Sequence, residues 1–407
     1  MLMRTGTEVL RISNRALILA CLRDIESAAH TDFMDWTDLA SGTVSVITNE
    51  LMEEGAIGRV EMPPPSGRGR PRAHFKINPD FAKVSIVRVA GDRVEYSLID
   101  YAGRIQDRFE EIRPPEETDA EVFFERFEAG LARQCERGGF ERSGLKVISI
   151  TTKGLVSPTR DSLLWSPVFE TQRIDFRKRL EANWSAKVIL TNETLYSALT
   201  NASRMDHPKI LPGQRHAILS LGHSVGFGLA SFDAQGKLTS QAPPFGHMVH
   251  LPDGPLCRCG SHGCIEAFAG FYGILRTAFD VKGDVKPANF IPDEQIDRVA
   301  ADARIGDRRS EYAFRLAGEA LGIGLSRLVS LFGAMSITVT GRGVRNFDLL
   351  EPGFRAPLAD NLQIRFAKSP EIRLERDETQ MIYDGNVKAS LRELDETLVA
   401  TRLIGEA

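Results

Sequence analysis

Short strand-like runs alternate with amphipathic stretches from Lys83 onward, and this alternation restricts the possible folds more than any other feature of the chain. The runs are rich in Val, Ile and Leu and cover 84–89, 93–100, 145–151, 186–191, 216–222 and 336–341, with a helix expected near 119–138. Such alternation is typical of α/β domains. Because the runs form two blocks, about 83–190 and 210–345, we expect two lobes with a cleft between them and a mostly helical last third.

The first 80 residues have a different pattern. Apolar side chains recur at helical spacing in 14–25 and 43–57, and Thr31 with Asp32 could open a further helix between these two. Two β-prone runs, 59–62 and 73–77, then flank a turn rich in Pro, Gly and Arg. Three helices followed by a β-ribbon form a winged helix-turn-helix. We therefore expect a DNA-binding domain over 1–80 and an α/β domain over 83–407.

Length and composition agree with a globular protein of two or three domains. The chain has 407 residues, 42% of them hydrophobic and 26% charged, which exceeds what one core organises. No apolar run approaches the ~18 residues of a membrane span, and the start lacks the apolar region of a secretion signal. We expect a cytoplasmic protein with no membrane partner. The net charge of −4 argues against general polyanion binding but permits a local basic patch.

Cysteine is concentrated in one short stretch. Three of the five cysteines, Cys257, Cys259 and Cys264, lie within eight positions, and His247 precedes the first by ten. Clustered thiols in a reducing compartment usually bind metal. Three thiolates and an imidazole suit tetrahedral Zn²⁺ and leave no position for a reactive water, so residues 247–264 are predicted to form a structural zinc loop.

Two alternatives to this ligand set remain open. The cysteines could be buried free thiols beside an unrelated histidine. Another histidine could replace His247 as the fourth ligand, the candidates being His223, His250 and His262.

The same stretch carries a family resemblance. "FGHMVHLPDGPLCRCGSHGCIEAFAG", residues 245–270, resembles the signature of the ROK family, G-E-x-G-H followed by P-D-G-P-x-C-x-C-G-x-x-G-C-L-E. The family groups bacterial repressors, open reading frames of unknown role and sugar kinases. With an N-terminal winged helix ending in a G-R-P turn, the chain is similar to the repressor branch over nearly its whole length. The resemblance implies a two-lobed, actin-like (ribonuclease-H-like) fold for 83–407 and zinc at His247, Cys257, Cys259 and Cys264.

Departures from the family pattern argue against kinase activity. Family kinases carry D-x-G-G-T at the first strand-turn, where this chain reads "RVAGD" and places Asp92 at the threonine position. A carboxylate there would repel a nucleotide phosphate. The catalytic base of the family is the Asp of an N-D motif, which is replaced here by Glu193. Because a displacement of ~1 Å can cost ~100-fold in rate, we predict that the protein is not an enzyme.

The resemblance also implies a sugar pocket, which is only partly retained. Asn192, His247 and Glu266 match family positions that bind hexose hydroxyls, whereas Glu193 and Pro244 are substitutions. A hexose would lose a charge-assisted hydrogen bond at Pro244, typically ~1.5–3 kcal/mol. The effector is then an altered sugar, a sugar phosphate or no sugar. The predicted effector contacts are Asn192, Glu193, His247 and Glu266.

The DNA-binding residues are predicted on one helix and one turn. If the second helix of the motif reads DNA, it starts near Ser41 and presents the short polar residues Ser41, Gly42, Thr43, Ser45, Thr48 and Asn49. Asn49 could pair with adenine, but no arginine is present to read guanine. The alternative is a merely solvated helix face. In the turn "GRGRP", Arg68 and Arg70 form a basic hook suited to an A·T minor groove, with Arg72 and Lys76 near phosphates.

These features predict a regulator, most simply a repressor, of carbohydrate uptake or catabolism genes. It would bind double-stranded operator DNA and sense a sugar-like molecule without phosphorylating it. A homodimer or homotetramer is expected, because a winged helix with few strong base contacts gains specificity by reading two half-sites. The alternatives are a ROK sugar kinase and a regulator whose C-terminal domain binds a protein partner.

Overall fold

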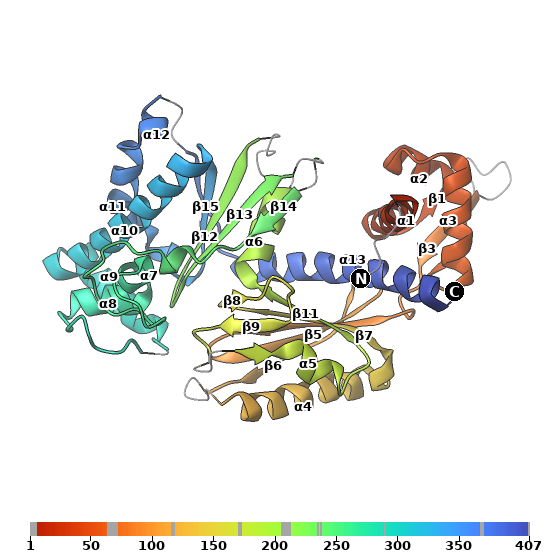
Figure 1. Cartoon of the computed structure of the whole chain (residues 1–407), viewed down its shortest axis with the longest axis horizontal. Coiled ribbons are helices and arrows are strands. Elements are labelled where there is room, and N and C mark those ends of the chain that lie inside the picture. Colours follow the sequence, from red (N-terminus) through yellow and green to blue (C-terminus); the bar gives the residue numbers. More distant parts are fainter. Residues whose placement is uncertain are drawn as a thin grey trace.

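Two sheets with the same strand order organise the protein. The computed structural model describes residues 6–405 except 63–71, 115–118, 170–172, 205–212, 234–235, 237, 289 and 367–369. Its two five-stranded sheets have the orders β11-β7-β4-β5-β6 and β14-β13-β12-β15-β16. In each, three antiparallel strands are extended by two parallel ones on the side of the first strand. The predicted two-lobed α/β fold is thus confirmed, with one lobe above the other in Figure 1.

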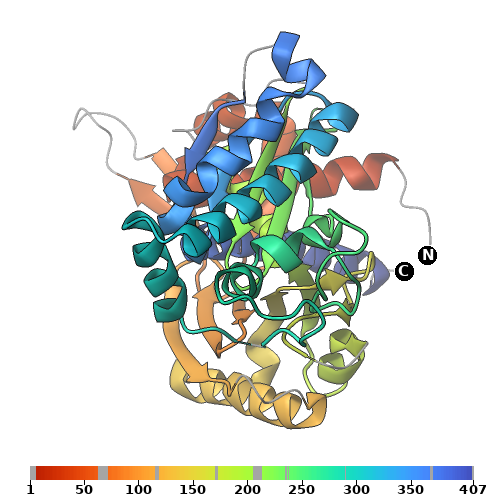
Figure 2. The same ribbon diagram turned by 90° about the vertical axis from the view of Figure 1, so that its left-hand side faces the viewer.

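The first lobe is built on a sheet whose two faces are covered by different helices. Its elements are β4 (Lys83–Val89), β5 (Arg93–Asp100), β6 (Ile105–Ile112), α4 (Ala120–Gly138), η1 (Arg142–Gly144), β7 (Leu145–Thr152), β8 (Leu155–Val156), β9 (Ser162–Trp165), β10 (Ile174–Asp175), α5 (Phe176–Glu181) and β11 (Lys187–Asn192). Side chains alternate across a strand. Val87 and Val89 accordingly pack with the phenylalanines of α4, on the face seen in Figure 2 to point away from the second lobe. Val84 and Ile86 contact the opposite cluster, which includes Leu391.

The second lobe repeats this two-faced packing. Its elements are α6 (Glu193–Ser203), β12 (Arg215–Leu221), β13 (Val225–Phe232), β14 (Leu238–Gln241), η2 (Phe245–His247), α7 (Ile265–Ala269), α8 (Phe271–Ala278), α9 (Asp293–Arg304), α10 (Arg308–Phe332), β15 (Ser336–Thr340), η3 (Arg342–Asn346), α11 (Phe347–Ala359), α12 (Leu362–Phe366) and β16 (Ile372–Leu374). Ala217 and Leu219 of β12 pack with Leu321 of α10. Ile218, on the other face, packs with Ala198 of α6. Helix α6 therefore lies against the side of the second sheet nearer the first lobe (Figure 1).

The N-terminal segment contains the three expected helices and the ribbon. They are α1 (Gly6–Ile25), α2 (His30–Thr37) and α3 (Ser41–Glu53), followed by β2 (Ile57–Met62) and β3 (Arg72–Ile77), with a short β1 (Ala28–Ala29) completing a sheet of order β1-β3-β2. Asp32 accepts a hydrogen bond from the backbone N–H of Ala29 at 2.8 Å, which stabilises the start of α2. Ile18, Phe33 and Val44 are fully buried in the core that the three helices share.

Helix α13 joins the lobes to the N-terminal segment. It spans Glu378–Gly405, 28 residues, and runs from α6 past the first sheet to α1 (Figure 1). Near its end, the Asp395 carboxylate accepts two hydrogen bonds from Arg23 of α1, at 2.7 and 3.0 Å, and one from the Tyr101 hydroxyl at 2.8 Å. The second sheet also extends to Leu374, beyond the expected limit of 345, and the return of α13 to the first lobe was not anticipated from the sequence. Within the described residues, no helix has both the length and the apolarity needed to cross a membrane.

Candidate functional site

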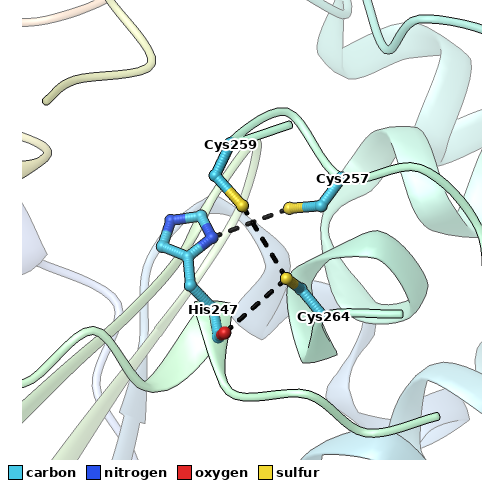
Figure 3. Close-up of side chains that lie close together, drawn as sticks. All are labelled: His247, Cys257, Cys259 and Cys264. Carbon is cyan, nitrogen blue, oxygen red and sulfur yellow. Dashed lines mark hydrogen bonds between the residues drawn. The ribbon is translucent and has the colours of Figure 1, made fainter. Parts of the chain in front are cut away.

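Four predicted ligands come together in one cluster. The His247 nitrogen and the sulfur atoms of Cys257, Cys259 and Cys264 lie within 4.8 Å of one another (Figure 3). The Cys257 Sγ to His247 Nδ1 distance is 3.6 Å, and the Cys259 Sγ to Cys264 Sγ distance is 3.7 Å. A tetrahedral zinc ion, with bonds of ~2.3 Å to sulfur and ~2.0 Å to nitrogen, separates its ligands by about 3.5–3.8 Å. The cluster could therefore hold one metal ion, and of the candidate histidines it is His247 that joins the cysteines.

The loop that carries these ligands depends on glycine. Gly260 and Gly263 have φ values of +89° and +69°, which side chains rarely adopt. A Cβ on Gly263 would also lie 1.6 Å from the carbonyl oxygen of Leu251. These turns bring Cys257 and Cys264 back toward η2, which presents His247.

A cavity between the lobes contains the four predicted effector residues. Asn192, Glu193, His247 and Glu266 all line a space of about 70 Å³. The ring of Trp165, from the first lobe, meets the His247 ring edge-on at 4.8 Å between centroids. His247 thus borders the cavity while its Nδ1 lies near the Cys257 sulfur, and Figure 3 shows its other nitrogen turned away from the sulfur atoms.

Glu193 is a buried carboxylate held by two cations. Only 1% of its side chain is exposed; its Oε2 accepts a hydrogen bond from Arg88 Nε at 3.1 Å, and its Oε1 lies 3.5 Å from Lys153 Nζ. Burial by itself would raise the pKa of Glu193, but Arg88 and Lys153 outweigh it and hold this pKa below its usual value. A general base works best with a pKa near the operating pH, so this carboxylate is poorly suited to take up a proton.

Asn192 and Glu266 are oriented by local hydrogen bonds. Asn192 caps α6, since its Oδ1 accepts from the Thr194 N–H and hydroxyl at 2.9 and 2.7 Å, and its Nδ2 donates to Gly154 O at 2.6 Å. Glu266, 1% exposed, accepts from the Val225 N–H at 3.0 Å. Each side chain retains hydrogen-bonding capacity beyond these contacts, so both can still meet a ligand.

A second, larger cavity adjoins the first. It measures about 310 Å³ and shares Lys153, Pro167 and Ser224 with the smaller cavity. Asp92 lies on its wall, 2.9 Å from Arg93 and 3.7 Å from Arg342. Burial would raise the pKa of Asp92, but these arginines lower it overall. Because their charges offset the carboxylate, Asp92 repels an anion here less than the sequence alone suggests.

The predicted DNA-reading residues of α3 divide by exposure. Ser41, Gly42 and Asn49 are exposed, and Thr43 and Ser45 are half-buried. Arg68 and Arg70 lie outside the described residues.

The prediction for Thr48 is wrong. Its side chain is 1% exposed, and its hydroxyl donates to Val44 O at 2.8 Å. Positions 44, 48 and 51 share one helical face, and that face is buried in the core. Val46, by contrast, is exposed, at 57%, and its apolar side chain gave no polar signal in the sequence.

Several residues around the cavities were not foreseen. Lys153 and Trp165 come from loops and short strands of the first lobe and belong to no motif. Arg88 was visible as a departure from the family turn, but its contact with Glu193 joins positions 105 residues apart.

Comparisons with known proteins match most of the chain. A model of the ROK family matches residues 85–381. The xylose repressor of Caldicellulosiruptor bescii is 24% identical over 338 residues, covering 80% of this chain and 82% of the repressor. The glucokinase of Streptomyces coelicolor is 24% identical over 273 residues, covering 63% of this chain and 80% of the kinase. Among solved structures, a ROK family transcriptional regulator, a homolog of the E. coli MLC protein, superposes with a TM-score of 0.71 and 17% identity over 95% of this chain and 98% of its own.

Proposed function

Because the chain belongs to the ROK family, we propose that it is a transcriptional repressor of carbohydrate uptake or catabolism genes that senses a sugar-like effector without phosphorylating it. The observation that carries this proposal is how much more of the chain is similar to a transcriptional regulator than to the kinases of the family. The superposition on a transcriptional regulator covers 95% of the chain, whereas the superposition on the glucokinase of Streptomyces griseus covers 76% and the sequence match to the glucokinase of Streptomyces coelicolor 63%. Such a protein acts on DNA in the cytoplasm.

In this proposal residues 1–80 form a winged helix-turn-helix and residues 83–407 the sensing domain. Helix α3 reads the major groove through Ser41, Gly42, Thr43, Ser45 and Asn49, with Val46 available to contact thymine methyl groups. Arg68 and Arg70 remain candidates for the minor groove on sequence grounds.

The metal cluster is assigned a structural zinc. Three cysteines and a histidine at tetrahedral spacing form a closed site. When bound, zinc would fix the loop without reacting. His247 would then be anchored while its ring borders the effector cavity, so the loop supports the pocket.

Two features favour sensing over phosphoryl transfer. Glu193 occupies the position of the family's catalytic base, but its negative charge is balanced by ion pairs with Arg88 and Lys153. Asp92 stands where the family kinases have a threonine, so the hydroxyl that approaches the nucleotide phosphates in those kinases is missing here. Incubation of the pure protein with ATP and a panel of hexoses should therefore yield no phosphorylated sugar, and turnover above background would establish the kinase alternative.

Selection of binding sites from random duplex DNA tests the proposal directly. We expect a two-fold symmetric site with half-sites about one helical turn apart, bound by a dimer or tetramer in sizing experiments. A protein with no preference over competitor DNA at ~150 mM salt is not a repressor. If it instead captures one protein partner through the sensing domain, the protein-binding alternative gains.

A further inference from the structure

The second cavity between the lobes is unusually rich in cations. Its walls include the basic residues Arg88, Arg93, Lys153, Arg258, Arg342 and Arg376, but only three acidic ones, Asp92, Glu95 and Glu378. These residues come from both lobes and from the segment that precedes α13. Neither zinc binding nor operator recognition requires such a surface.

Three of these arginines form no ion pair, or only long ones, with the described carboxylates. Among the described residues, neither Arg258 nor Arg376 has a carboxylate within ion-pair distance. Arg342 has only long contacts, 3.5 Å to Asp293 and 3.7 Å to Asp92. Arg258 donates weakly to His223 O at 3.4 Å, and its Nε is buried with no hydrogen-bond partner. The guanidinium lies over the Tyr272 ring at 4.9 Å, which fixes its position but balances none of its charge, so it remains available to an anion.

The surroundings of His223 have the same excess of positive charge. Its ring lies between Phe271 and Phe290, at centroid distances of 5.2 and 4.9 Å, and both ring nitrogens are buried without a partner. Burial, followed by the charges of Lys153, Arg342 and Arg258, lowers the pKa of His223 to about 3. The ring is therefore neutral and offers one N–H donor to the cavity.

The two cavities adjoin, since Lys153, Pro167 and Ser224 line both. The smaller one presents hydroxyl-binding groups, Asn192 and Glu266, beside the Trp165 ring, while the larger one presents guanidinium groups. A phosphate dianion suits several arginines that approach from separate segments, because each of its three terminal oxygens accepts charge-assisted hydrogen bonds.

We propose that the effector is a phosphorylated sugar, with its hydroxyl-bearing part in the smaller cavity and its phosphate among Arg258, Arg342 and Arg376 in the larger one. The inference rests on the proposed function and specifies the chemical class of its effector. Arg258 stands between two metal ligands, Cys257 and Cys259, so the loop held by the metal also carries a phosphate contact. Lys153 of the first lobe also lines this cavity, so a bound anion would lie between cations of both lobes.

Inorganic phosphate is the first probe. Thermal unfolding of the full-length protein should shift upward with phosphate at constant ionic strength, and R258Q/R342Q should weaken the apparent phosphate affinity at least tenfold. R304Q is the matched control, since Arg304 is as exposed as Arg342, at 43%, but pairs with Asp348 away from the cavity. A wild-type protein without a phosphate-dependent shift, or a double variant that responds like R304Q, overturns the proposal.

Paired sugars are the second probe. D-glucose with D-glucose 6-phosphate, D-xylose with D-xylose 5-phosphate, and ATP are compared by calorimetry. One phosphorylated sugar should bind at least tenfold more tightly than its free partner, and the R258Q/R342Q variant should lose that ratio. Free sugars that bind as tightly as their phosphates overturn the proposal. ATP that binds more tightly than every sugar phosphate also overturns the proposal, because it would indicate a nucleotide cleft. The same holds if inorganic phosphate binds but no phosphorylated sugar is preferred over its free partner.

Operator binding by the ligand-free wild type is measured in parallel. Its absence defeats the proposed function, whereas intact operator binding without phosphate recognition defeats this inference alone.

Discussion

Cys259 is one of four side chains whose polar atoms lie within 4.8 Å of one another. A metal ion bound by such a cluster contributes its binding free energy to the stability of the fold. C259S should therefore lower bound zinc and thermal stability together. C135S is the control, because Cys135 is a buried thiol of α4 outside the cluster. Zinc content by mass spectrometry and unfolding temperature check the prediction, and a wild-type protein with well under one zinc per chain after growth with adequate zinc contradicts it.

His223 makes stability depend on pH. Its pKa is lowered to about 3, by burial first and then by Lys153, Arg342 and Arg258, with Asp293 acting in the opposite direction. Since the unfolded histidine binds a proton near pH 6.5 and the folded one does not, folding loses stability as pH falls below that value. H223Q should remove part of this loss between pH 7 and 5, measured by urea unfolding. Parallel pH profiles for the two proteins would show that His223 does not contribute.

At the scale of elements, one face of α3 is buried in the core, and the opposite, exposed face is the one proposed to contact DNA. T48V replaces a buried hydroxyl that donates only to the Val44 and Ser45 carbonyls of its own helix, so operator affinity should stay within about twofold. N49A removes an exposed amide and should cost ~1–3 kcal/mol of discrimination at one base pair. Gel-shift titrations with the selected site and one altered site check both. If T48V weakens operator binding as much as N49A, the exposed face of α3 is not the face that contacts DNA.

Local pattern predicted the elements well but not their partners. The strands were visible because β-branched runs such as 84–89 and 186–191 need two buried faces. The Cys/His cluster was visible because the spacing of its residues is local and their chemistry is restrictive. Thr48 was misplaced because the polarity of one residue cannot fix the rotation of a helix. The Arg88–Glu193 pair and the Trp165 contact depend on tertiary folding, which no short window contains.

At the scale of the whole molecule, one buried ion pair links α13 to α1, and so the proposed sensing domain to the proposed DNA-binding domain. The side chains of Arg23 and Asp395 are 14% and 3% exposed. D395A leaves the guanidinium without its carboxylate, and loss of one partner of a buried pair typically costs ~3–5 kcal/mol. E396A is the control, since Glu396 forms an exposed pair with Arg392 within α13, worth about 0.3–0.5 kcal/mol. Urea unfolding and hydrogen exchange in α1 should both change in D395A and hardly change in E396A; equal effects would remove the special role of Asp395.

The position of α13 also fixes an order of events during synthesis. Arg23 and Asp395 are 372 positions apart, and at ~5–20 residues per second the ribosome takes roughly 20–70 s to make the intervening chain. Throughout that interval α1 can pack with α2, α3, the β2–β3 ribbon and the strands of the first sheet, but not with α13. Leu391 and Leu394 join this core last. A nascent chain thus has α1–α3 long before it has the helix that ties them to the two lobes, and if α1–α3 bind DNA as proposed, only a finished chain can place them under the control of a ligand.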